Sequence, residues 1–193
     1  MHRKQLSFMA ALVVLLAPLA IQADPDRHLE LAAGAAWESR SADVQAGVSN
    51  RLEDIGGFVH LGVPIAVTRQ LSIAPTATLA QFNGTSQPMG CPDCFQISHL
   101  RSVSAGLNLD VARRWRGLAV YLQGGPQFTW QTSRLDGGLT GQGDSTSTTN
   151  LGLQASLGTA VPLGTHVSMG LLWRTYANRE ALGTSLGLSF SLR

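Results

Sequence analysis

Charged residues are scarce in this chain. Asp, Glu, Lys and Arg make up 13% of its 193 residues, whereas about a quarter is usual in soluble globular proteins. Aromatic residues reach only 6%, and the helix-favouring residues Lys and Glu are few, while Gly, Ser and Thr are abundant. After the N-terminal segment, no apolar run approaches the roughly 20 residues that a membrane-spanning helix needs. The composition therefore favours a single domain of strands and turns, with a surface short of charge.

Cysteine is almost absent as well. The only two thiols belong to Cys91 and Cys94, in the stretch Cys91-Pro92-Asp93-Cys94. In an exported protein this spacing predicts a disulfide that closes a loop. A redox or metal role is the alternative, but no second Cys pair completes a zinc site and His99 is the nearest His. We expect no metal and no cofactor.

The N-terminus has the composition of a secretory signal peptide. His2, Arg3 and Lys4 precede an apolar stretch over residues 6–20, which predicts a signal over residues 1–23 with cleavage after Ala23, and a mature domain over residues 24–193. An uncleaved N-terminal anchor is the alternative. The chain carries 14 basic and 12 acidic residues, and the loss of Arg3 and Lys4 makes the two counts equal. The basic pI of the precursor therefore gives no indication of nucleic-acid binding.

Eight segments of the mature chain alternate between apolar and small polar residues. In the fifth, for example, Leu118, Val120 and Leu122 alternate with Tyr121 and Gln123. Such a two-residue period predicts strands. The eight segments span residues 29–37, 59–67, 71–79, 103–111, 118–130, 151–161, 167–173 and 186–192.

The connections between these segments alternate in length. Short turns are expected at residues 69–70, 113–116 and 164–165, and longer polar, Gly-rich loops near residues 40–57, 83–97, 132–148 and 177–183. An even number of amphipathic strands, with short turns at one rim and long loops at the other, is typical of a transmembrane β-barrel of the outer-membrane type. We therefore predict an all-β fold, a closed eight-stranded antiparallel barrel of up-and-down topology. A soluble secreted β-barrel, with the apolar parity inside, is the alternative.

Aromatic positions agree with this interpretation, because aromatic residues of such barrels gather at the membrane interfaces. Trp37, Trp130 and Trp173 fall on the apolar parity near the long-loop ends of their strands, and Phe190 approaches the short-turn rim. The fourth tryptophan, Trp115, falls in the predicted Arg113 to Arg116 turn. The apolar parity is thus expected to face lipid and the polar parity the lumen.

On this pattern the chain resembles the small eight-stranded bacterial outer-membrane β-barrels, the OmpA, OmpX and OmpW-like group, over residues 28–193. The resemblance implies residence in the outer membrane, with outer-membrane lipid and the barrel assembly machinery as partners. In the family that machinery reads an alternating final strand that ends in an aromatic residue. Leu186, Leu188 and Phe190 supply the alternation, but this chain ends in Leu192-Arg193.

Charged residues on the lumen parity are the candidate site residues, because burial is costly unless charges are paired. Glu38, His60 and Arg174 all fall towards the long-loop ends, so we expect a salt-bridged cluster that plugs the lumen. Glu30 and Asp110 share the lumen parity. An acid/base site using Glu38 and His60 is the alternative, although no Ser or Cys nucleophile is specified beside them.

The predicted function is a structural or surface-interaction role for a barrel with a largely closed lumen, without enzymatic activity. The long loops, above all residues 134–149, could meet an extracellular or envelope partner, or none. One alternative is an envelope-lipid-modifying enzyme similar to the lipid A deacylase barrels. That family carries His and Ser two residues apart on the seventh strand, where this chain has Thr175-Tyr176-Ala177-Asn178. A small-ligand carrier or narrow channel is a further alternative.

Overall fold

The computed structural model describes residues 29–44, 48–68, 71–82, 96–136 and 144–192. The signal-peptide and disulfide predictions lie outside these residues. Nine strands are present: β1 (Leu29–Val44), β2 (Val48–Gly62), β3 (Ile65–Ala66), β4 (Ser72–Phe82), β5 (Gln96–Trp115), β6 (Leu118–Asp136), β7 (Asp144–Pro162), β8 (Val167–Asn178) and β9 (Ala181–Leu192). The two-residue β3 continues β2 after Val63-Pro64 and also pairs with β4, so β2 and β3 together form one wall strand of the barrel.

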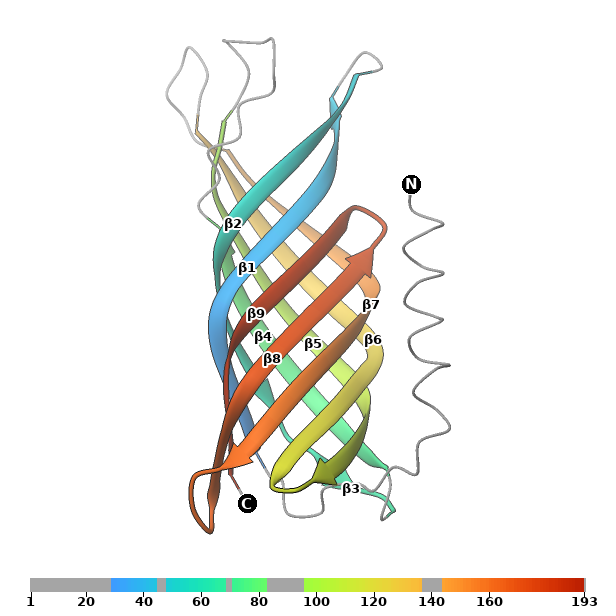
Figure 1. Ribbon diagram of the computed structural model, residues 1–193. Coiled ribbons are helices and arrows are strands. Elements are labelled where there is room, and N and C mark those ends of the chain that lie inside the picture. The colour runs from blue at the N-terminus through green and yellow to red at the C-terminus, as the bar shows by residue number, and fades with distance from the viewer. Residues whose placement is uncertain (1–28, 45–47, 69–70, 83–95, 137–143, 193) are drawn as a thin grey trace.

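The strands close into an antiparallel barrel (Figure 1). Consecutive strands pair with one another, except that β2 and β3 both pair with β4, and the last strand β9 pairs with the first strand β1. The predicted eight-stranded, all-β, up-and-down architecture is therefore confirmed. Among the described residues, no helix is long and apolar enough to cross a bilayer.

The two side-chain parities separate as predicted. Leu107, on the apolar parity of β5, has 52% of its surface exposed on the outer wall, whereas Gln123, on the polar parity of β6, is 1% exposed in the lumen. The sequence analysis missed the larger apolar side chains in the lumen, because they lie at the strand ends or interrupt the alternation. These are Phe58, Phe82, Leu100 and Leu172, all nearly fully buried.

Much of what was predicted as loop is strand. The prediction of a long loop over residues 40–57 is wrong, because β1 continues to Val44 and β2 begins at Val48. The loop predicted over residues 132–148 is shortened in the same way by β6 and β7. The fourth predicted long loop, over residues 177–183, is a tight turn in which the Asn178 side chain accepts hydrogen bonds from the backbone N–H groups of Glu180 and Ala181.

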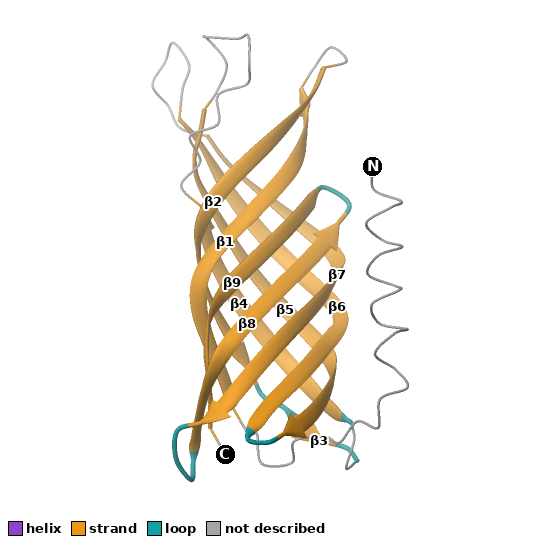
Figure 2. Cartoon of the chain, in the orientation of Figure 1, coloured by secondary structure: helices purple, strands orange, loops and turns teal. Residues whose placement is uncertain are grey.

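The extensions of β1, β2, β6 and β7 make one rim of the barrel uneven. This rim, at the long-loop ends of the strands, is called the outer rim. The β1–β2 hairpin and the upper parts of β5, β6 and β7 rise above the β8–β9 hairpin (Figure 1). Short turns join the strands at the opposite rim (Figure 2). Paired backbone of β1, β2, β5, β6 and β7 thus continues beyond the level of the β8–β9 turn.

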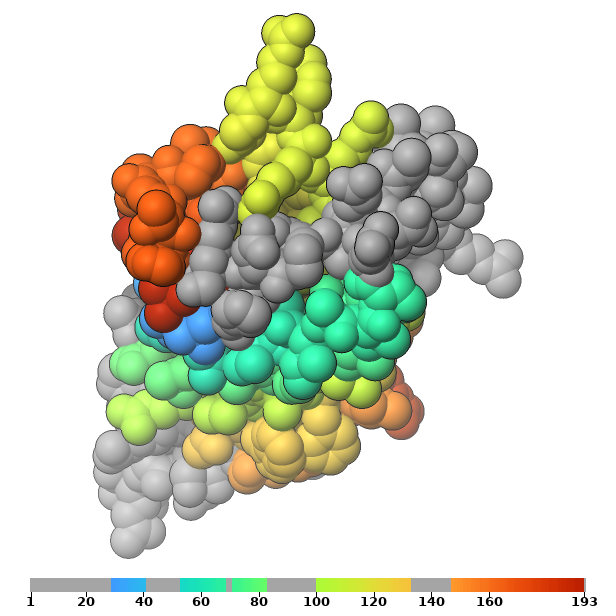
Figure 3. Space-filling view, turned by 90° about the horizontal axis from the view of Figure 1, so that it is seen from below, coloured from blue at the N-terminus to red at the C-terminus, as the bar shows by residue number. Residues whose placement is uncertain are grey.

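The turn between β5 and β6 is tighter than predicted. β5 extends to Trp115, and the connection is Arg116-Gly117, with φ angles of 47° and 89°. Positive φ at both central residues is the signature of a type I′ hairpin turn. Trp115 is exposed, and the Arg116 guanidinium lies 5.8 Å from the centre of its ring. The yellow-green hairpin stands out from this face of the barrel (Figure 3).

Candidate functional site

The lumen contains two glutamates on β1, each held by a tyrosine. The Tyr121 hydroxyl donates to Glu30 Oε1 at 2.7 Å, and the Tyr176 hydroxyl donates to Glu38 Oε2. Both carboxylates are almost fully buried. Because an ionised carboxylate in such surroundings is costly without charged or hydrogen-bonding partners, these contacts are what allow two acids to occupy the lumen.

Each tyrosine ring lies over a glycine of the next strand. Tyr121 is directly opposite Gly158 on β7, and Tyr176 is directly opposite Gly183 on β9. A Cβ atom added at either glycine would overlap the tyrosine ring. Glycine is therefore required at both positions, since the ring occupies the space that any other side chain would fill.

Glu30 anchors the half of the lumen nearer the short turns. Its second oxygen accepts a hydrogen bond from Gln123 Nε2 at 3.1 Å, and Gln123 Oε1 in turn accepts one from Ser156 at 3.2 Å. A Cβ added at Gly62 would lie 3.6 Å from His60 Nε2 and 3.7 Å from Glu30 Oε2. The His60 ring and the Glu30 carboxylate therefore face the same small space.

Glu38 anchors the half nearer the outer rim. Arg40 Nε lies 2.9 Å from Glu38 Oε1, and Arg40 Nη2 lies 3.6 Å from Asp54 Oδ2. Gln131 Nε2 donates to both oxygens of Glu38, at 3.1 and 3.3 Å. Arg40 thus balances two buried carboxylates from adjacent strands, with only 13% of its own side chain exposed.

Arg174 occupies the level between these two groups. Its Nη2 donates to Gln154 Oε1 at 2.7 Å and to Gln127 Oε1 at 3.5 Å. Gln154 Nε2 continues the network to Asn108 Oδ1 at 2.8 Å and to Thr76 Oγ1 at 3.0 Å. The amides of β6 and β7 therefore surround the guanidinium and link it to β4 and β5.

The three residues expected to form one cluster, Glu38, His60 and Arg174, are all buried in the lumen. Their contacts run to different partners: Glu38 to Arg40, His60 Nδ1 to Thr78 Oγ1 at 2.9 Å, and Arg174 to Gln154. The sequence analysis missed Arg40 and Asp54 because both fell within the predicted loop. It placed Tyr121 on the lumen parity, but it did not identify Tyr121 or Tyr176 as the partners of the acids.

The expected interface aromatics lie on the outer wall. Trp130, Trp173 and Phe190 are each a little under half exposed, and Trp37 is half-buried. The Trp173 indole donates to Thr184 Oγ1 at 2.8 Å, and that hydroxyl donates to the Arg174 carbonyl oxygen at 3.0 Å. The indole N–H therefore has a hydrogen-bond partner within the protein, so the exposed ring does not depend on water for one.

Within the described part of the chain, no three His, Cys, Asp or Glu residues are grouped to hold a metal ion. In the stretch compared with the lipid A deacylases, Tyr176 points into the lumen towards Glu38, and Glu180 accepts a hydrogen bond from Asn150 at 3.0 Å. Tyr176 and Glu180 thus have separate hydrogen-bond partners, Glu38 and Asn150.

Closed eight-stranded antiparallel β-barrels with apolar outer walls and polar lumens form a class that is known from small outer-membrane proteins. The chain has this fold. No protein-family model matches the chain, and no curated protein sequence matches it.

Solved structures of the same architecture are similar to it. Neisserial surface protein A superimposes with a TM-score of 0.53 and 14% sequence identity, over 85% of this chain and 96% of that chain. Ail, the attachment invasion locus protein of Yersinia pestis, crystallised with the heparin analogue sucrose octasulfate, gives a TM-score of 0.50 and 12% identity over 86% and 98%. At these identities the similarity concerns the fold.

Proposed function

We propose that this protein is a bacterial outer-membrane β-barrel with a closed lumen, and that it has a structural or surface-interaction role rather than an enzymatic one. Supporting this location, the outer wall carries exposed Leu, Val, Ile, Phe and Trp side chains on every wall strand. A closed barrel with such a wall leaves no backbone group unpaired in hydrocarbon.

The closed lumen is supported above all by hydrogen bonds that cross its diameter at two levels. In the order of strands around the barrel, β6 is four strands from β1 in either direction. Yet Tyr121 and Gln123 of β6 bond to Glu30, and Gln131 of β6 bonds to Glu38. Side chains that meet in the middle at two levels leave no wide aqueous path, as expected for a barrel of eight strands.

The surface role is supported by the uneven outer rim. Paired backbone of β1, β2, β5, β6 and β7 extends beyond the β8–β9 hairpin (Figure 1). These hairpins offer a firmer recognition surface than irregular loops would, because their backbone hydrogen bonds fix the spacing of side chains.

The location is tested by membrane fractionation of cells that express the full chain, combined with gel mobility before and after boiling. A folded barrel in the outer-membrane fraction, with a mobility that changes on heating, is the expected result. Recovery with the soluble periplasmic proteins would disprove the location.

The closed lumen is tested separately, by recording from purified protein in planar bilayers. We expect only small or no conductance. A variant with Gln123→Ala and Gln131→Ala, which removes amide contacts at both levels, should conduct more than the wild-type chain. Large, steady conductance from the wild-type protein would show that the lumen is open.

A further inference from the structure

We propose that the outer wall of β4, β5, β6 and β7 binds one anionic phospholipid, with the phosphate held by Arg101 and an acyl chain in the groove beside Ala105. This inference rests on the proposed membrane location. It follows from a row of polar side chains, an apolar groove below that row, and the distance between the two.

The polar row consists of Gln81, Arg101 and Thr132. Gln81 on β4 is directly opposite Arg101 on β5, and Arg101 is directly opposite Thr132 on β6. All three are exposed on the outer wall. Directly paired residues have Cβ atoms about 5 Å apart, so a guanidinium, an amide and a hydroxyl are presented side by side. One arginine guanidinium can donate two hydrogen bonds to two oxygens of the same phosphate. Neutral donors such as an amide or a hydroxyl can bind the remaining oxygens.

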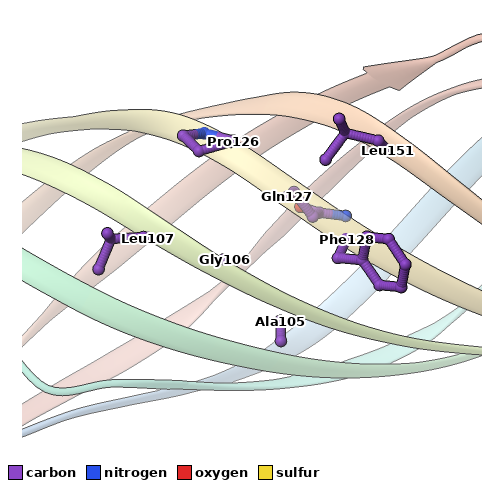
Figure 4. Close-up of a pocket in the computed structure, with 7 residues that line it drawn as sticks. All are labelled: Ala105, Gly106, Leu107, Pro126, Gln127, Phe128 and Leu151. Atoms are coloured by element: carbon purple, nitrogen blue, oxygen red, sulfur yellow. The ribbon is translucent and has the colours of Figure 1, made fainter.

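The groove lies on β5, β6 and β7 (Figure 4). On β5 its residues follow Arg101 in the direction of the short β5–β6 turn. It has a volume of about 300 Å³ and is lined by Ala105, Gly106, Leu107, Pro126, Gln127, Phe128 and Leu151. Leu107, Phe128 and Leu151 contribute the larger apolar side chains of this lining, and Ala105 and Gly106 the small residues. Its apolar lining matches an acyl chain.

Two arginines place the polar row at the edge of the hydrocarbon. Arg101 and Arg113 are both exposed on the outer face of β5, and the outward residues between them are Val103, Ala105, Leu107, Leu109 and Val111. At about 3.3 Å per residue and a strand tilt of about 40°, the two arginines are roughly 30 Å apart along the barrel axis. This is about the thickness of the hydrocarbon core.

The same geometry relates the row to the groove. Leu107, at the far end of the groove, lies about 15 Å below Arg101 along the axis, which is about the depth of one leaflet. A lipid with its phosphate at Arg101 would therefore lay its acyl chain past Trp130 and into the groove. Trp130 is directly opposite Val103, and its ring meets that of Phe128 with centroids 4.7 Å apart.

Trp130 provides the reporter for a test on the full chain in lipid vesicles. In a background with Trp37→Phe, Trp115→Phe and Trp173→Phe, quenching of Trp130 fluorescence is measured with phosphatidylglycerol brominated at mid-chain and with phosphatidylcholine brominated at the same carbons. We expect phosphatidylglycerol to be preferred by about fivefold, the effect of one arginine near an anionic headgroup. Arg101→Gln should abolish the preference, whereas Arg113→Gln, at the other edge of the apolar band, should retain it.

The groove has its own matched pair of variants. Ala105→Phe fills the groove and should reduce quenching by the brominated chain at least twofold. Ala77→Phe places the same ring directly opposite position 105, on β4, but outside the groove lining, and should leave quenching unchanged.

Three results would overturn the site: equal quenching by the two lipids, an unchanged preference in Arg101→Gln, or equal effects of Ala105→Phe and Ala77→Phe. In each case the heat-modified gel mobility of the variant shows that the barrel has formed. Failure of the proposed location looks different, because a chain that does not enter the vesicles is quenched by neither lipid.

Discussion

Tyr176 reaches across one whole strand to donate its hydroxyl hydrogen bond to Glu38. Tyr176, Gly183 and Glu38 lie in a single register row on β8, β9 and β1, and the ring passes over the glycine in the middle. The carboxylate is also held by Arg40 and Gln131. A tyrosine, a glycine and a glutamate therefore function as one unit that joins the last strands of the barrel to the first.

Tyr176→Phe tests the contribution of this hydrogen bond. Loss of a hydrogen bond to a buried charged group should lower the free energy of unfolding by about 1.5 to 3 kcal/mol, measured by urea titration of the folded barrel in vesicles. Trp115→Phe, at the exposed rim, is the control and should change it by less than about 0.5 kcal/mol. Equal values for the two variants would contradict a role for the hydroxyl.

Gly158→Ala tests the other tyrosine. The added methyl group would overlap the Tyr121 ring, so the ring must move away from Glu30, at a cost of about 1 to 3 kcal/mol. Gly164→Ala is the control, because nothing lies within 4 Å of a Cβ at that turn position. In the Gly158→Ala background, Tyr121→Ala should cost less than it does in the wild-type chain; additive costs would show that the two residues are not coupled.

The β5–β6 turn offers a stabilising substitution. Arg116 has a φ of 47°, which is unfavourable for most side chains but tolerated by Asn. Arg116→Asn should therefore raise the free energy of unfolding by roughly 0.5 to 1 kcal/mol, whereas Gly117→Ala should lower it. Both free energies are measured by the same urea titration. If Arg116→Asn is destabilising, the contact between Arg116 and the Trp115 ring contributes more than the relief of backbone strain at position 116.

Spin labels distinguish the two faces of the wall. Labels are attached at Leu107→Cys and Gln123→Cys in a chain whose own cysteines are replaced by Ser. The label at 107 should be accessible to oxygen dissolved in lipid, as should a control label at Leu109, because both side chains are exposed outward. The label at 123 should be shielded. The reverse pattern would place the apolar parity inside the protein.

The barrel wall was predictable because an apolar outer face and a polar lumen impose a simple rule on it. Between Val103 and Val111, every second residue of β5 must be apolar, and this two-residue period is visible in the sequence. Before Arg101 in β5, polar residues occur on both parities. The period then disappears although the strand continues, which is why β1, β2, β6 and β7 were predicted too short.

The lumen network was predictable only in part. The parity of Glu38, His60 and Arg174 assigned them to the interior, since an odd or even position decides the face of a strand. Which of them meet depends on register and on which strands are opposite one another. The contact between Glu30 and Tyr121 joins residues 91 positions apart, and no local pattern encodes that distance. Arg40 was missed for a different reason, because it follows the last residue of the visible alternation.

The location of both glutamates on β1 also bears on how the protein is made. β1 meets β9, the last strand of the chain, at the seam of the barrel. While that seam is open, Glu38 is separated from Tyr176, and the carboxylates of β1 are not held opposite the β6 amides. The polar network therefore stabilises the closed barrel much more than intermediates in which β1 and β9 are not yet paired. Pairing of β1 with β9 and desolvation of the two acids should then occur in one cooperative step.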